Sequence, residues 1–195
     1  MQPPEWCRKA GARLNLEEFG AEFARAWSLM TWRFLKLECW QSYQELDTNK
    51  SLEAYNAGDF DRARDLLEGE AEADRPLYDG VRNRGIQYAR IRLVQLPLTP
   101  YLAYEMINYR IRREMGEAIE VVEMPATVTL PNERYFDFLL FDVESALIHD
   151  YGDDGRQVGG WITGQSEVLR ALEATAVSLR REASGLADFL AKASS

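Results

Sequence analysis

The side chains best suited to chemistry lie in one stretch of the sequence, residues 88–117. Arg90 and Arg92 stand in an alternating segment. The helix-like segment that follows places polar and aromatic side chains in one sector, at 3.6 residues per turn: Tyr101, Tyr104, Glu105, Asn108 and Arg112. Two guanidinium groups can hold a carboxylate or phosphate while tyrosine rings stack on a ligand. A ligand site is one hypothesis. The other is that Glu105 pairs with an arginine and the tyrosines only cover a sheet.

Three further ionisable residues could take part in catalysis. Asp137 and Asp142 bracket an apolar segment, and two carboxylates can act as general acid and base, although turn formation also explains them. His149 is the only histidine, and the sequence has no nucleophile in a GxSxG context. The cysteines, Cys7 and Cys39, show no metal-binding spacing. We therefore expect no metal and no cofactor, and whether the protein is an enzyme stays open.

The composition is that of an ordinary globular protein. The chain has 195 residues, of which 46% are hydrophobic and 28% charged, so it can bury the core of one domain. Its net charge of -9 opposes sequence-independent binding to phosphate backbones, which depends on clustered Lys and Arg. No segment approaches the roughly 20 apolar residues that span a bilayer, and the N-terminus lacks a signal-peptide pattern. We expect a cytoplasmic protein with neither nucleic acid nor membrane as a direct partner.

The first half of the sequence is predicted to be helical. Asn15 and Glu18 form a capping box, and the apolar stripe that begins after them continues at helical spacing as far as Leu37. Between Lys50 and Gly85, glycines and a proline interrupt the helical pattern. This segment is expected to form two or three short helices.

From Ile86 onward the pattern indicates a sheet. An alternating strand, a helix over 100–115 with Thr-Pro at its start, and a strand from Ala118 predict one βαβ unit. The segment FDFLLFD is a further strand, and a hairpin turns at residues 152–155. An amphipathic helix over 166–192, interrupted near its end, closes the chain.

Together these elements predict a single α+β domain, residues 1–195. N-terminal helices (14–85) are expected to pack on a mixed sheet of about five strands (86–163) that contains one βαβ unit and a hairpin. A C-terminal helix (165–193) closes the domain. The turn at 97–101 would lie at the carboxyl end of a strand, where clefts form in such folds.

Several segments resemble one protein family. They are KLECWQSY, with Lys36, Leu37, Glu38 and Tyr43; ARIRLVQLPLTPYLAYE, with Arg90, Arg92, Val94, Pro97, Thr99, Tyr101 and Glu105; GEAIEVV; and DFLLFD with the later Tyr151, Asp153 and Gly155. The pattern is similar to the actinobacterial domain of unknown function DUF6879, whose members often occur with helix-turn-helix regulators. The resemblance implies a cytoplasmic, regulatory protein and brings no catalytic residues. Lys36 departs from the usual Arg, which weakens bidentate recognition there.

These observations are compatible with two functions, and also with a purely structural role as a scaffold or dimer subunit. The first is a non-catalytic module that senses a small molecule or binds a regulator protein. The alternative is a small enzyme of specialised metabolism that acts on an aromatic or amino-acid-like substrate by acid/base chemistry. The candidate ligand- or partner-binding residues are Lys36, Glu38, Arg90, Arg92, Tyr101, Tyr104, Glu105 and Asp142.

Overall fold

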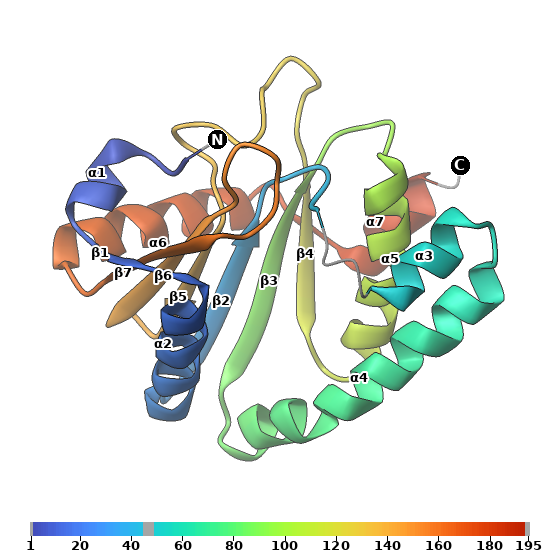
Figure 1. Cartoon of the computed structure of the whole chain (residues 1–195), viewed down its shortest axis with the longest axis horizontal. Coiled ribbons are helices and arrows are strands. Elements are labelled where there is room, and N and C mark those ends of the chain that lie inside the picture. The colour runs from blue at the N-terminus through green and yellow to red at the C-terminus, as the bar shows by residue number, and fades with distance from the viewer. Residues whose placement is uncertain (1, 45–48, 194–195) are drawn as a thin grey trace.

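The computed structural model describes residues 2–44 and 49–193 (Figure 1). Its helices are α1 (Glu5–Lys9), α2 (Leu16–Leu29), α3 (Lys50–Asn56), α4 (Phe60–Asn83), α5 (Pro100–Glu114), α6 (Ser166–Arg180) and α7 (Leu186–Ala193). Its strands are β1 (Ala12–Leu14), β2 (Arg33–Glu38), β3 (Gln87–Val94), β4 (Ala118–Glu123), β5 (Phe138–Phe141), β6 (Ser145–Asp150), β7 (Gly159–Thr163) and β8 (Ser184–Gly185).

The strands form one mixed sheet in the order β1-β7-β6-β5-β2-β3-β4-β8. Strands β2, β3 and β4 are parallel and the other pairings are antiparallel. The α+β class, the βαβ unit β3-α5-β4 and the β6-β7 hairpin are as predicted. The expected five strands are wrong, because the described residues contain eight.

Strand β2 is the most consequential of the strands that the sequence analysis missed. Its residues Phe34 and Leu37 also fit the three-residue spacing of a helix, and neither glycine nor proline separates them from α2. In the structure α2 ends at Leu29 and β2 lies between β3 and β5. A central strand gains hydrogen bonds on both edges, and this pairing overrides the helical pattern. The proposed division into a helical part (14–85) and a sheet part (86–163) therefore does not hold.

The two faces of the sheet differ in chemistry. The side chains of Leu35, Leu37, Ile91 and Leu93 lie on one face and form the main core with α6. Arg90 and Arg92 lie on the opposite face, since side chains alternate along a strand. That second face carries α2 over one half and α5 with α7 over the other. Between these helices lie the middle parts of β2 and β3 (Figure 1).

Two helical predictions need correction. The segment expected to form short helices contains α4, which continues from Phe60 to Asn83 through Pro76. A proline inside a helix costs roughly 3 kcal/mol, and burial of Leu67, Ala71 and Tyr78 offsets that cost. The closing helix is two helices, α6 and α7, separated by the short edge strand β8.

Candidate ligand-binding site

A cavity of about 530 Å³ opens on the second face of the sheet. Its floor consists of Lys36 and Glu38 from β2 together with Tyr88 and Arg90 from β3. Register explains why these four meet: Lys36 is paired with Arg90, and side chains two residues apart in a strand share a face. The cavity therefore lies over the parallel core of the sheet.

Helices α4 and α5 form one wall of the cavity. The α5 sector predicted from helical spacing lines it throughout: Tyr101, Tyr104, Glu105, Asn108 and Arg112. The neighbouring helix α4 contributes Glu70, Asp74 and Tyr78, which are spaced four residues apart and so share one side of that helix. Both helices connect parallel strands, and they lie on the same face of the sheet.

The remaining sides come from loops and from the start of α2. They include Tyr43, Tyr151 and Leu16. Tyr43 contacts Tyr101, with ring centroids 5.6 Å apart, and Tyr151, at 4.9 Å. Six tyrosines line the cavity in total: Tyr43, Tyr78, Tyr88, Tyr101, Tyr104 and Tyr151. Such rings combine apolar faces with hydroxyl groups that donate and accept hydrogen bonds.

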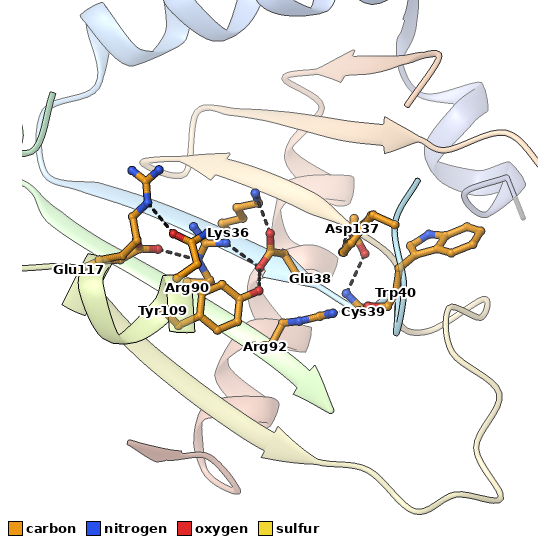
Figure 2. Close-up of polar contacts among 12 residues, drawn as sticks. Lys36, Glu38, Cys39, Trp40, Arg90, Arg92, Tyr109, Glu117 and Asp137 are labelled. Carbon is orange, nitrogen blue, oxygen red and sulfur yellow. Dashed lines mark hydrogen bonds and ion pairs between the residues drawn. The ribbon is translucent and has the colours of Figure 1, made fainter. Parts of the chain in front are cut away.

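Ion pairs on the floor are centred on Glu38 (Figure 2). Its carboxylate lies 2.7 Å from Lys36 Nζ and 2.7 Å from Arg90 Nη1, and it accepts a 2.9 Å hydrogen bond from the Tyr109 hydroxyl. The second guanidinium edge of Arg90 donates from Nε to Glu117 Oε1 at 2.6 Å. Arg90 thus bridges two buried carboxylates.

The same network continues towards the α4 wall. Glu117 Oε2 accepts a 2.9 Å hydrogen bond from Tyr78, whose hydroxyl is 3.4 Å from Arg112 Nη1. Arg112 in turn pairs with Asp74. Acidic and basic groups therefore alternate from Asp74 to Lys36, and we call this set the ion ladder: Asp74, Arg112, Tyr78, Glu117, Arg90, Glu38 and Lys36.

The ladder sets the charge states of its members. Burial alone would raise the pKa of Glu38, but the charges of Arg90, Lys36 and Arg92 hold it well below its ordinary value. Burial and the charge of Glu117 raise the pKa of Tyr78 to about 12. At neutral pH Glu38 is therefore ionised and Tyr78 keeps its proton.

Arg92 and Asp137 lie beside the cavity floor, near the carboxyl end of β2. Arg92 is fully buried, donates to the Trp40 carbonyl and lies 5.6 Å from the Tyr43 ring centroid. Asp137 accepts a 2.8 Å hydrogen bond from the Cys39 amide and another from the Tyr43 hydroxyl. Burial, with a contribution from the charge of Glu38, raises the pKa of Asp137 to about 6. Neither residue lines the cavity.

His149 lies on the same face of the sheet, one strand beyond β5. Its ring stacks on Tyr151, with centroids 5.3 Å apart and planes 7° apart, and contacts Phe19 at 4.8 Å. Burial, assisted by the charge of Lys36, lowers the pKa of His149 to about 3. The ring is therefore neutral at physiological pH.

The structure brings most of the candidate residues together. Those that line the cavity are Lys36, Glu38, Arg90, Tyr101, Tyr104 and Glu105. Arg92 is buried on the same face of the sheet but does not line the cavity, and Asp142 lies elsewhere, at the start of β2. The Asp142 carboxylate accepts hydrogen bonds from the amides of Thr31, Trp32 and Arg33, which lower its pKa against the effect of burial. These three hydrogen bonds stabilise the fold and are not part of the cavity.

Sequence reasoning missed the contribution of α4 and the partners of Arg90. Glu70, Asp74 and Tyr78 follow the same four-residue spacing that identified the α5 sector, but the intervening Pro76 had indicated a break. Glu117 and Tyr109 carry no local signal, because the sequence does not state which carboxylate an arginine will reach.

In the described residues, no three His, Cys, Asp or Glu side chains are grouped so that they could hold a metal ion. Residues 2–44 and 49–193 also contain no helix that is both long and apolar enough to cross a lipid bilayer.

Comparison with solved structures gives a similarity to TrmBL2, an archaeal chromatin protein reported to show a novel mode of DNA binding. The identity is 11% and the TM-score 0.43, and the match covers 89% of this chain and 51% of the other. This chain thus spans about half the length of that one. No curated protein matches the sequence.

This comparison corrects one prediction. The sequence predicts that nucleic acid is not a direct partner. That prediction is wrong, because a chain similar to this one belongs to a DNA-binding protein. The physical reason is that a net charge of -9 describes the whole surface, whereas phosphate contacts depend on local groups of Lys and Arg. At this TM-score the similarity carries no argument that the present chain binds DNA.

A family model matches residues 21–191, which include every residue of the ion ladder and all of α2 to α6 except the first residues of α2. The expected resemblance is confirmed: the chain belongs to the family described as the domain of unknown function DUF6879.

Proposed function

We propose that the protein is a non-catalytic module that senses a small molecule, which it binds in the cavity over β2 and β3. The observation that carries the proposal is a hollow of about 530 Å³ lined by six tyrosines above a floor of paired charges. This volume is within the range of roughly 300–1,000 Å³ that is usual for small-molecule sites. We further propose that the protein acts in the cytoplasm and that ligand binding changes its interaction with a regulator protein.

Rigidity of the floor supports a preformed site. Arg90 is held through two of its nitrogen atoms, to Glu38 and Glu117, at 2.7 and 2.6 Å. A guanidinium held on both sides does not rearrange when a ligand arrives, so little ordering cost opposes binding. Ring contacts hold the tyrosines on the rim in the same way, as between Tyr43 and Tyr151.

The acid/base enzyme has less support. A general base needs access to its substrate and a pKa near the working pH. Asp137 has a pKa raised to about 6, but it is 2% exposed and does not line the cavity. The arginine pair expected to clamp a substrate carboxylate is also divided, because Arg92 is fully buried and does not line the cavity.

Thermal denaturation with a panel of compounds tests the proposal. The panel contains cationic, anionic, neutral and zwitterionic aromatics, and a short DNA duplex is added as a separate arm. A ligand at a hundred times its Kd adds about 2.7 kcal/mol of stability. For a domain of this size, that raises Tm by roughly 5–10 °C.

Two variants localise the effect. Asn108→Trp puts a large ring into the cavity and should abolish the Tm shift, since Asn108 is part of its lining. Arg110→Trp adds the same ring at an exposed position of α5 outside the cavity and should keep the shift. The proposal fails if no small molecule raises Tm, or if DNA alone does.

A further inference from the structure

The lining of the cavity is almost wholly polar. Twenty of the residues in 2–44 and 49–193 line it, and among them only Leu16 and Gly155 lack a polar side-chain group. Typical small-molecule sites are instead lined mainly by hydrophobic side chains. An apolar guest would leave the polar groups of this lining without hydrogen-bond partners, which opposes binding.

The charges of these lining residues balance. Four of the residues are basic and four are acidic. Two of the pairs are in direct contact, Lys36 with Glu38 and Arg112 with Asp74. A ligand ion of either sign would upset this balance, or would have to separate such a pair and leave one charge uncompensated, which is costly. A guest without net charge avoids both effects.

Hydroxyl groups can bond to paired charges without separating them. A carboxylate accepts up to about four hydrogen bonds and an ammonium group donates about three, so each member of a pair keeps capacity for a further partner. A hydroxyl both donates and accepts, and acidic and basic groups alternate along the ion ladder. Four amide side chains of the lining, Asn108 and Gln157 among them, also offer a donor beside an acceptor. The lining therefore suits a guest with several hydroxyl groups.

Tyrosine rings supply the flat surfaces of the cavity. The ring centroids of Tyr43 and Tyr101 are 5.6 Å apart and those of Tyr101 and Tyr104 are 6.1 Å apart, so the three rings adjoin one another. The face of an aromatic ring is negative, and C–H groups next to oxygen atoms are slightly positive. A saturated ring with C–H groups on its face and hydroxyl groups around its edge therefore matches both the tyrosines and the polar groups.

We propose that the ligand is a neutral sugar in its pyranose form. Its hydroxyl groups bond to the charged and amide side chains of the lining, and its C–H face packs on the tyrosine rings. This inference rests on the proposed small-molecule function and specifies its ligand class.

Calorimetric titration with matched sugars tests the inference. The neutral probes are the methyl pyranosides of glucose, galactose and mannose. Each is compared with its uronate, in which a carboxylate replaces the hydroxymethyl group, and with its amino sugar, in which an ammonium group replaces one hydroxyl. At least one neutral probe should bind wild-type protein, and it should bind at least about tenfold more tightly than either of its charged counterparts.

Asn108→Leu keeps the size of the side chain and removes its amide. It should weaken binding of the best neutral sugar by about tenfold, and Gln157→Leu, in the loop before β7, should do the same. Both residues are partly exposed, so the variants are expected to fold, and their melting curves check this. Asn83→Leu is the matched control: Asn83 is exposed on α4 and lies outside the cavity, so the affinity should not change.

The alternative outcomes separate the two proposals. A charged sugar that binds as tightly as its neutral counterpart overturns the sugar inference and keeps the cavity function. Binding of a neutral sugar that neither Asn108→Leu nor Gln157→Leu weakens also overturns the inference. If no sugar binds but a compound of the thermal panel does, the inference falls and the function stands. If none of these compounds binds, both fall.

Discussion

Replacing Arg90 with methionine should destabilise the fold through the two carboxylates that it leaves behind. Arg90 is 8% exposed and contacts Glu117 at 2.6 Å and Glu38 at 2.7 Å. After the substitution Glu38 keeps Lys36 and Tyr109 as partners, whereas Glu117 keeps the 2.9 Å hydrogen bond from Tyr78. The uncompensated charge of Glu117 should therefore cause most of the loss of stability.

Removing one partner of a buried ion pair costs about 3–5 kcal/mol, and we expect Arg90→Met to fall in this range at pH 7. The free energy of unfolding can be followed in urea through the five tryptophans of the chain.

The double variant Arg90→Met/Glu117→Gln is the control. It removes the stranded charge and keeps a polar group near Tyr78, so it should recover about 2 kcal/mol relative to Arg90→Met. One contradicting result is a cost of Arg90→Met below about 1 kcal/mol, and another is a double variant in which the costs of the two single substitutions simply add. Either result would show that Arg90 and Glu117 are not coupled in the folded protein.

Three further changes test buried polar groups outside the cavity lining. The pKa of His149 in the folded protein is about 3, against an ordinary 6.5. Stability that is present above pH 6.5 is therefore lost as the pH falls to 3, by about 5 kcal/mol. His149→Phe should remove this dependence of the free energy of unfolding on pH. Acid unfolding curves that coincide with wild type would contradict this. For Asp137 the sign is reversed, because its pKa rises from 3.8 to about 6 and the folded state loses stability as the pH rises through that interval. The stability advantage of Asp137→Asn over wild type should therefore grow by about 3 kcal/mol between pH 4 and pH 7, and urea titrations at the two pH values check the trend. Asp142→Ala should cost about 2–3 kcal/mol, since it leaves the amides of Thr31, Trp32 and Arg33 without their acceptor; Asp142→Asn, which keeps one oxygen, should cost less.

Local signals in the sequence were sufficient for β3 and α5. Thr99 caps α5 by accepting from the Leu102 amide, and Pro100 stands at the first helical position, as the sequence predicts. Helical spacing then identified the α5 sector that lines the cavity. Cap chemistry and helical periodicity are properties of a short segment, so one sequence is enough to find them.

Features that depend on partners distant in the chain could not be predicted. The role of Arg90 depends on Glu117, 27 residues later, and on Glu38, 52 residues earlier. The strand character of β2 likewise depends on pairing with β3 and β5. The expected pairing of an arginine with a carboxylate was correct in kind, but the carboxylates are Glu38 and Glu117.

A structure of the protein in complex with the compound that gives the largest Tm shift would be the most direct test of the central claim. The compound should lie over Lys36 and Arg90, against the α5 side chains Tyr101 and Asn108, while the Arg90 contacts to Glu38 and Glu117 stay in place. A compound bound at another surface, with the cavity over β2 and β3 empty, would contradict the claim.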